Sequence, residues 1–264
     1  MNRLSTLLLV SSLFLVACGG GDTNPASTEA TASKNYDCVI KYGWEPRPPY
    51  QFLHNGEMQG IDIEIFKKAA DATQCNIQYV QKSWTELLTA LENGDIDVLG
   101  GATETPDRKA FADFSVPYRS ESFALFIRST SNYQGDTLSS FLSGGNKVGI
   151  TSDYYYGQDV YNLMNHPQYG PLFIDDNSGE QSFYNVIYST IDGVLTDPVE
   201  GRYIIKRKGL DSQVKESNVK IPSDNVSFMF SKKGLSPEKA KALQDAIKQL
   251  VTANEVNPVV AKYQ

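Results

Sequence analysis

The chain has 264 residues, of which 41% are hydrophobic and 21% are charged, a composition that suits one large or two small globular domains. Its formal net charge is −7 and no run is rich in lysine and arginine, which argues against nucleic acid as a partner. No long apolar segment follows the first residues, so membrane attachment is expected to come from lipid rather than from a spanning helix.

Residues 1–17 predict a secretory signal peptide. A short polar start containing Arg3 precedes the apolar run LSTLLLVSSLFLVA, which is too short to span a bilayer comfortably and ends in small residues. The segment LVAC, residues 15–18, resembles the lipobox of bacterial lipoproteins, in which the cysteine is acylated and becomes the first mature residue. The alternative is a plain signal peptide with an incidental Cys18. Residues 18–35 are small, polar and rich in Gly, Ser, Thr and Pro, which predicts a lipid-anchored flexible linker.

From residue 36 to residue 121, predicted strands and helices alternate. The predicted strands are CVIKYGW (38–44), NIQYV (76–80) and DIDVLGG (95–101), and the predicted helices are IDIEIFKKAADAT (61–73) and SWTELLTALENG (83–94). Ser83 and Glu86 form a capping box for the second helix, which Gly94 ends. This alternation predicts right-handed crossovers and a parallel sheet.

The remaining chain repeats the pattern more loosely. We expect SFALFIR (122–128) to cross into a second unit, with strands at KVGI (147–150), PLFI (171–174) and DGVLTD (192–197). TSDYYYGQDVYNLM (151–164) predicts a loop that enters a helix, and SFMFSKKG (227–234) a returning strand. The most strongly marked helix is 236–255, because Ser236 can cap it and Pro237 suits its first position.

Two cysteines remain once Cys18 is acylated. Cys38 and Cys75 each stand just before a strand-like run, and an even number suits an oxidising compartment. If these strands are parallel neighbours, they start at the same edge of the sheet, and a spacing of about 4.8 Å is compatible with a disulfide. We therefore predict a Cys38–Cys75 disulfide; the alternative is two separately buried thiols.

Signatures of catalysis are missing from the sequence. The two histidines, His54 and His166, are far apart and have no metal-ligand cluster beside them. No G-x-S-x-G motif is present, and SGGNKVG lacks the spacing of a phosphate-binding loop. We therefore expect no enzyme activity, no cofactor and no metal site.

Arg108 stands at a position where a cation needs an anionic partner. Thr105 can cap a helix there and Pro106 suits its first position, so Arg108 stands in a first turn that already carries the positive end of the helix dipole. A cation is unfavourable at that end unless an anion meets it. The sequence leaves open whether that anion is a ligand carboxylate or a structural residue such as Asp113.

The order strand, Gly100–Gly101, Thr103 and helix is typical of a ligand site in an α/β sheet. Ligands lie outside the carboxyl ends of the strands, near helix N-termini. Glycines let a ligand approach the backbone, Thr103 offers a hydroxyl, and the planar guanidinium of Arg108 matches a carboxylate.

Several motifs together resemble the bacterial extracellular solute-binding proteins of family 3, which capture amino acids. The resemblance rests on GIDIEIFKKAA (60–70), GDIDVLGGATETPDRKAFADFSVPYRSE (94–121), IDGVLTD (191–197) and the closing VVAKYQ (259–264). It implies an α/β fold of two lobes, each a mostly parallel sheet flanked by helices, joined by two crossing hinge segments and closing on the ligand like a flytrap. Lobe 1 would comprise 36–119 and 225–264, and lobe 2 would comprise 120–224.

The resemblance also implies site residues. Arg108 matches the arginine that binds the ligand carboxylate and Thr103 the neighbouring hydroxyl, while Asp197 matches the aspartate that binds the ammonium. The other implied contacts are a backbone group of Gly101, backbone N–H groups of Tyr154 and Tyr155, and aromatic walls from Tyr50 and Trp84. Trp84 could equally be core, because it begins an apolar helix stripe.

Two positions depart from the family pattern. Arg47 stands where many members have an aromatic residue that stacks on the ligand side chain, and Asp153 stands where a glycine usually precedes the contacts of the second lobe. Both put the identity of the ligand in doubt.

The function implied is a monomeric, non-enzymatic lipoprotein that captures an amino acid or related small organic acid for the permease of an ABC-type transporter. Two alternatives share the fold: an enzyme resembling cyclohexadienyl dehydratases, and a ligand-sensing subunit for a signalling partner. Gly19, rather than Asp, follows Cys18, which predicts attachment to the outer membrane facing the periplasm, if the cell has an outer membrane.

Overall fold

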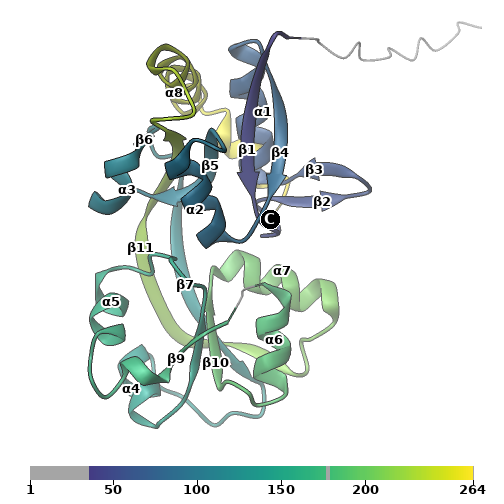
Figure 1. The fold of residues 1–264 in the computed structure, drawn as a ribbon. Coiled ribbons are helices and arrows are strands. Elements are labelled where there is room, and N and C mark those ends of the chain that lie inside the picture. The colour runs from purple at the N-terminus through teal and green to yellow at the C-terminus, as the bar shows by residue number, and fades with distance from the viewer. Residues whose placement is uncertain (1–35, 177–178, 264) are drawn as a thin grey trace, which may run out of the picture. The chain divides into compact units, whose positions relative to one another are not determined.

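The computed structural model describes residues 36–176 and 179–263 (Figure 1). The predicted signal peptide, the Cys18 lipid anchor and the linker lie outside the described residues.

The described chain alternates short strands and helices. The strands are β1 (Cys38–Trp44), β2 (Phe52–His54), β3 (Glu57–Gln59), β4 (Cys75–Gln81), β5 (Val98–Thr103), β6 (Ala112–Phe114), β7 (Arg119–Arg128), β8 (Val148–Ile150), β9 (Phe173–Asp175), β10 (Gly193–Thr196) and β11 (Val214–Ser231). The helices are α1 (Ile61–Ala72), α2 (Trp84–Asn93), α3 (Pro106–Phe111), α4 (Leu138–Ser143), α5 (Gln158–Met164), α6 (Glu180–Ile187), α7 (Pro198–Lys208), α8 (Pro237–Thr252) and α9 (Val256–Ala261), with a 3-10 turn at Gly170–Leu172.

One sheet connects most of the strands. Its order is β4-β1-β5-β11-β7-β10-β8-β9, with β6 pairing on β11, while β2 and β3 form a separate hairpin. The outer strands pair in parallel: β1 pairs with β4 and β5 at one end, and β8 pairs with β9 and β10 at the other. The α/β architecture with two sets of parallel strands agrees with the prediction.

The two crossing segments are longer than the sequence patterns predict. They are the strands β7 and β11, which run side by side and pair antiparallel with each other (Figure 1). β11 has 18 residues, whereas the pattern predicts a strand only at its end. Because the crossing strands also pair with β5 and β10, the two expected sheets are continuous through them.

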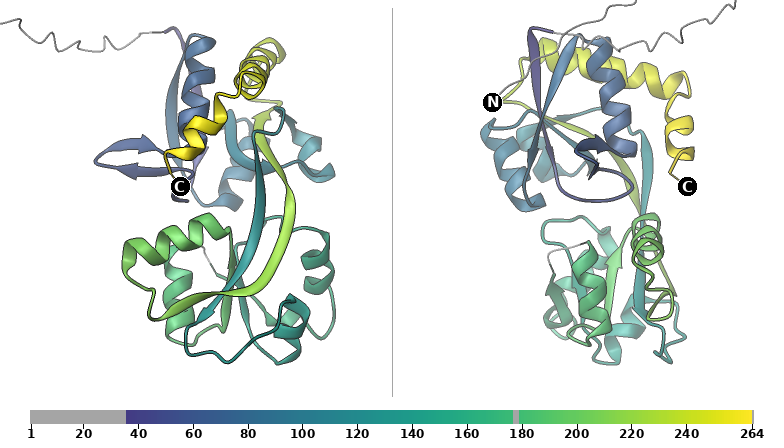
Figure 2. Two further views of the ribbon diagram at one scale, coloured as in Figure 1. Left: turned by 180° about the vertical axis from the view of Figure 1, so that it is seen from behind. Right: turned by 90° about the vertical axis from the view of Figure 1, so that its right-hand side faces the viewer.

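Each end of the sheet carries buried side chains on both faces. Neighbouring side chains of a strand point to opposite faces, and in the strands described next both sets are buried. On β5, Val98 packs in the cluster that contains α1 and α8, and Leu99 packs in the cluster that contains α2. We call these two clusters, whose buried members come from 40–118 and 226–259, core A. On β7, Leu125 and Phe126 likewise face different clusters, which draw on 123–221 and which we call core B. The rear view of Figure 2 shows β7 and β11 passing from the elements of one core to those of the other.

Cys38 and Cys75 form the predicted disulfide. They are directly opposite each other in the parallel pairing of β1 with β4, and their Cα atoms are 4.5 Å apart. The bridge therefore joins the first residues of two neighbouring strands at one edge of core A.

The predicted helix caps are also present. Ser83 and Glu86 form the capping box of α2, with Gly94 in the left-handed conformation at its end, and Ser236 caps α8. At α3, the Thr105 hydroxyl accepts the backbone N–H of Arg108. Each cap depends on residues within one helical turn, which is why the sequence is sufficient to predict it.

Candidate functional site

Most of the predicted site residues line one small cavity of about 20 Å³, which has room for about one water molecule. The predicted residues among its walls are Arg47, Trp84, Gly101, Thr103, Arg108, Tyr154 and Tyr155. Gly100, which the sequence analysis expected beside a ligand, is also a wall, and three further walls, Glu45, Gln51 and Glu121, were missed. Core A elements supply most of the walls, while Glu121 lies on the crossing strand β7 and the tyrosines lie in the loop before α5.

Arg108 reaches from core A to the loop before α5. It is only 8% exposed, and it donates one hydrogen bond to the carbonyl of Thr103 at 2.9 Å and another to the carbonyl of Asp153 at 2.8 Å. Burial lowers the pKa of its guanidinium, while the negative charges of Glu121 and Asp153 act in the opposite direction. Asp113, the structural alternative, lies 4.0 Å from Lys232 instead. The hydrogen bonds of the Arg108 side chain therefore end on neutral carbonyls.

The backbone conformation of Asp153 explains why a glycine is expected at this position. Its backbone φ is 61°, in the left-handed region that favours glycine. This conformation accompanies a carbonyl that accepts from both Arg108 and the Trp84 indole, and a carboxylate that accepts from the Thr85 hydroxyl. Asp153 thus joins its loop to α2 and α3, and it is not among the walls of the cavity.

Trp84 serves both of the roles that the sequence left open. It is buried in core A with Leu87 and Leu91, and its ring also lines the cavity, 5.4 Å from the guanidinium carbon of Arg108. The ring therefore supports Arg108 through a cation–π contact as well as filling the core.

The two glycines within β5, Gly100 and Gly101, are required for different reasons. Gly101 has a positive φ of 70°, and its N–H donates to the Tyr118 hydroxyl at 2.8 Å. A side chain at Gly100 would begin 2.2 Å from the hydroxyl oxygen of Tyr42, so this glycine makes room for a core tyrosine. The expectation that Gly100 admits a ligand to the backbone is therefore not needed to explain it.

Tyr154, in the loop before α5, is used differently from the expectation. The backbone N–H of Tyr154 donates to the Thr151 carbonyl at 3.3 Å, while its hydroxyl donates to Glu45. Burial first, and then Glu45, raises the pKa of the Tyr154 phenol well above its usual value. Tyr154 contributes its side chain, rather than a free N–H, to the cavity. Tyr155 lines the same cavity.

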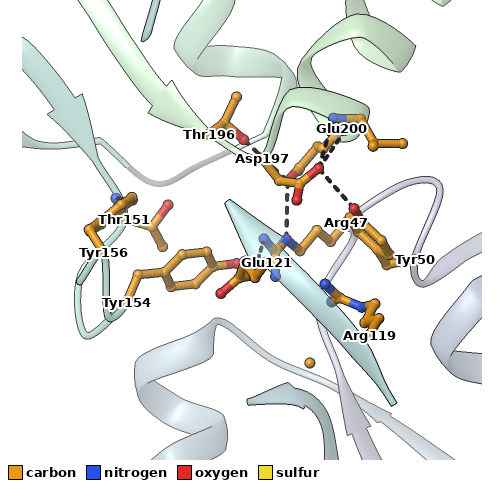
Figure 3. Close-up of polar contacts among 12 residues, drawn as sticks. Arg47, Tyr50, Arg119, Glu121, Thr151, Tyr154, Tyr156, Thr196, Asp197 and Glu200 are labelled. Atoms are coloured by element: carbon orange, nitrogen blue, oxygen red, sulfur yellow. Dashed lines mark hydrogen bonds and ion pairs between the residues drawn. The ribbon is translucent and has the colours of Figure 1, made fainter. Parts of the chain in front are cut away.

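Two predicted ligand contacts, Asp197 and Tyr50, are not among the cavity walls. They bind each other: the Tyr50 hydroxyl donates to Asp197 at 2.8 Å (Figure 3). The same Asp197 oxygen caps α7 by accepting the backbone N–H groups of Val199 and Glu200. Asp197 is thus an N-cap whose carboxylate links α7 to the loop before β2.

Arg47 is surrounded by acidic and aromatic side chains. It is 6% exposed, and its guanidinium donates to Glu200 at 3.1 Å and to Glu121 at 2.9 Å (Figure 3). The rings of Tyr50 and Tyr154 lie 5.4 and 5.2 Å from its guanidinium carbon. Burial alone lowers the pKa of this guanidinium, but the surrounding acidic groups raise it well above its usual value.

Glu200 is the most strongly perturbed acid of the group. Burial raises the pKa of its carboxyl group to about 7; Arg47 acts to lower it and Asp197 to raise it. Because desolvation disfavours the charged form, the pair with Arg47 offsets only part of the cost of burying this carboxylate.

A second buried ion pair was missed by the sequence analysis. Arg119 on β7 binds Asp62 on α1 at 3.1 Å, and its guanidinium carbon lies 4.0 Å from the centre of the Tyr50 ring. Asp62 is the first acid of the GIDIEIF motif, so an acid among the apolar residues of this motif was a sequence signal for a buried charge. A side chain at Gly101 would begin 2.9 Å from Arg119 and 3.1 Å from Asp62, so this glycine also makes room for the pair.

The described part of the chain offers neither a metal-binding cluster nor a membrane-spanning helix. Between residues 36 and 263, with 177–178 left out, no group of three or more His, Cys, Asp or Glu residues could hold a metal ion. Over the same residues, no helix has the length and apolar character that crossing a bilayer requires.

Fold and site together define a class: an α/β binding protein with two crossing strands and a buried charged cavity bordered by both halves. The chain belongs to the bacterial extracellular solute-binding proteins, family 3, whose sequence profile matches residues 40–264.

Individual proteins are similar over most of their length. A protein of Neisseria gonorrhoeae named "Probable histidine-binding protein" is 27% identical over 98% of this chain and 94% of its own. A Vibrio harveyi protein, "Putative amino-acid ABC transporter-binding protein PatH", is 24% identical over 78% of this chain and 82% of its own. Among solved structures, "An ancestral arginine-binding protein bound to arginine" has a TM-score of 0.74 at 21% identity, covering 87% of this chain and 99% of that one. This last similarity concerns the fold alone.

Proposed function

We propose that the protein is a non-enzymatic, extracytoplasmic receptor that captures a small α-amino acid and delivers it to the permease of an ABC-type transporter. Membership of the family supports this function, as do the names of the relatives from Neisseria gonorrhoeae and Vibrio harveyi.

The observation that carries the proposal is the bonding of Arg108. A buried guanidinium is most stable beside an anion, yet the hydrogen bonds of this one end on the neutral carbonyls of Thr103 and Asp153. It lines the cavity, so a ligand carboxylate that enters there can take over one or both bonds. Charge-assisted hydrogen bonds of this kind contribute about 1.5–3 kcal/mol each.

Asp197 is the candidate partner for the ligand ammonium. It has one donor that a ligand can replace, the Tyr50 hydroxyl, whereas the N–H groups of Val199 and Glu200 belong to its own helix. An ammonium in place of the hydroxyl forms a charge-assisted hydrogen bond with a buried carboxylate. One zwitterion would then bind to both halves of the chain.

Binding requires the two halves to move apart first. A cavity of about 20 Å³ does not admit an amino acid. The contacts that close it, such as Arg108 with Asp153 and Tyr50 with Asp197, join elements of core A to elements next to core B. We infer that the cores are the interiors of two lobes, 36–119 with 225–264 and 120–224, which hinge on β7 and β11. The ligand stabilises the closed state because it contacts both lobes.

The anchor completes the proposal. Acylated Cys18 and the linker 18–35 would hold a monomeric receptor at the membrane, on the periplasmic side of the outer membrane, if there is one, because Gly19 follows the cysteine.

A thermal-shift screen with the common amino acids and small organic acids tests the function, because a ligand that binds the native state raises the unfolding temperature. We expect at least one amino acid to stabilise the protein. For that ligand, Arg108→Ala should weaken binding by at least tenfold to a hundredfold in calorimetry while the protein remains folded.

Lys109→Ala is the matched control, because Lys109 follows Arg108 in the same helix but is exposed and pairs with Glu104. It should leave the affinity unchanged. Unchanged affinity in folded Arg108→Ala would show that Arg108 is structural, and the absence of any amino acid ligand would contradict the proposed function.

A further inference from the structure

Arg47 occupies a complete cation site that the protein builds from its own residues. Two carboxylates, Glu121 and Glu200, accept hydrogen bonds from different nitrogens of its guanidinium, and Tyr50 and Tyr154 place rings 5.4 and 5.2 Å from its carbon. We call these four residues the cation cage. Carboxylates and aromatic faces are the groups that bind a guanidinium or an ammonium most strongly.

The cage is not a local pairing within one element. Glu121 is 74 residues from Arg47 and Glu200 is 153 residues away, so three distant segments bring their acids and their cation together. Figure 3 shows Arg47 extending toward Glu200 and Glu121, which come from α7 and β7. This arrangement therefore forms only when the chain has folded.

The cage opens onto the cavity at which the proposed carboxylate contact lies. Arg47, Tyr154 and Glu121 are walls of the same cavity as Arg108. The third nitrogen of Arg47, Nη1, lies 3.8 Å from the point where a side chain at Gly101 would begin. A ligand whose carboxylate is held at Arg108 would therefore share this cavity with a guanidinium that is already bound.

We propose that Arg47 substitutes for a cationic ligand side chain and makes the protein select α-amino acids with uncharged or acidic side chains against arginine and lysine. This inference rests on the proposed function and adds the class of ligand. The other acid of the cavity wall, Glu45, already accepts a hydrogen bond from Tyr154. A second cation would meet Arg47 in a buried site where like charges repel strongly. A hydrogen-bond acceptor on the ligand would instead find Arg47 Nη1.

The selectivity of the unaltered protein is the first test. Calorimetric titration should show that L-arginine and L-lysine bind at least a hundredfold more weakly than the best amino acid of the screen. Equal or tighter binding of either of the two overturns the inference.

Emptying the cage is the second test. Arg47→Ala should gain at least tenfold in affinity for L-arginine, and millimolar methylguanidinium should raise its unfolding temperature. Arg207→Ala, which removes an exposed arginine beside Tyr203 on α7, is the matched control and should show neither effect. A folded Arg47→Ala variant that neither binds L-arginine more tightly nor is stabilised by methylguanidinium overturns the inference.

Two precautions keep the test decisive. If Arg47→Ala does not fold, the double variant Arg47→Ala with Glu200→Gln removes one of the stranded charges and is tested in the same way. The methylguanidinium measurement needs no ligand at Arg108, so it reports on the cage even if the unaltered protein binds no amino acid. Failure of that measurement contradicts the cage, whereas failure of the amino acid screen contradicts the proposed function.

Discussion

Arg47 and Arg108 are two buried arginines that line one cavity, and they are bonded in opposite ways. Arg47 donates to two carboxylates and lies beside two aromatic rings, whereas Arg108 donates to two backbone carbonyls. The exposed fractions of the two residues are 6% and 8%, so burial does not distinguish them. Arg47 is neutralised by the protein, whereas Arg108 has no carboxylate among its hydrogen-bond partners and is the cation that we propose meets an external anion.

The difference suggests how one cavity can combine two proposed contacts, one with the backbone of an amino acid ligand and one with its side chain. The surroundings of Arg108 follow the family motif, from the glycines through Thr103 to the helix. Arg47 itself stands where the resemblance leads us to expect an aromatic residue. The proposed contact with the ligand backbone thus lies in the part that resembles the family motif, and the proposed choice of side chain lies outside it.

Removing Arg47 should produce the largest effect on stability. Arg47→Ala strands Glu121 and Glu200 without their partner, and breaking a buried ion pair in this way typically costs about 3–5 kcal/mol. Urea unfolding at pH 7.5 should show a loss of this size. Arg108→Ala leaves only neutral carbonyls behind and should lose less, about 1–2 kcal/mol. If the two variants lose equal stability, the contrast between the two arginines is wrong.

Glu200 should make stability depend on pH. Its pKa is raised from 4.5 to about 7, chiefly by burial, so the folded state binds the proton more tightly than the unfolded state. The stability that the protonated Glu200 contributes is therefore fully present below about pH 4.5 and is lost as the pH rises through about 7. The free energy of unfolding falls by about 3 kcal/mol over this range.

Unfolding of Glu200→Gln across this pH range should show a shallower fall in stability than the unaltered protein. Glu45, whose pKa burial also raises, should leave a remaining slope, and Arg47, whose pKa is raised well above its usual value, stays charged in both proteins. Glu57→Gln, at an exposed position of β3, serves as the control. An unchanged slope in Glu200→Gln would show that this carboxyl group does not titrate as its burial implies.

Local features of the fold were predictable from the sequence. The caps of α2 and α8 lie within one turn of their helices, and the Cys38–Cys75 bridge follows from two parallel strands that start together. Helix α7 was not predicted although its signals are local: Asp197, its N-cap, was assigned to the end of the strand 192–197, and Pro198 stands at its first position. The β2–β3 hairpin, α4, α6 and α9 were also missed; they are short elements.

The partners of the buried charges were not predictable in the same way. The sequence marks Arg108 as a cation that needs a partner, but it does not reveal that Asp153 contributes its carbonyl from 45 residues away. The carboxylates that bind Arg47 and the bond between Tyr50 and Asp197 likewise depend on tertiary packing. A charge pattern along the chain shows that a group is unusual, and only the fold shows what it meets.

The most direct test of the account compares an amino acid ligand with its α-carboxamide by calorimetry, in the unaltered protein and in Arg108→Ala. The carboxamide lacks the negative charge that Arg108 is proposed to bind and is otherwise similar in shape. We predict that the unaltered protein prefers the free acid by at least tenfold, or about 1.4 kcal/mol, and that Arg108→Ala loses this preference. Equal affinity for acid and amide in the unaltered protein, or a preference that survives in Arg108→Ala, would contradict the claim that Arg108 binds the ligand carboxylate.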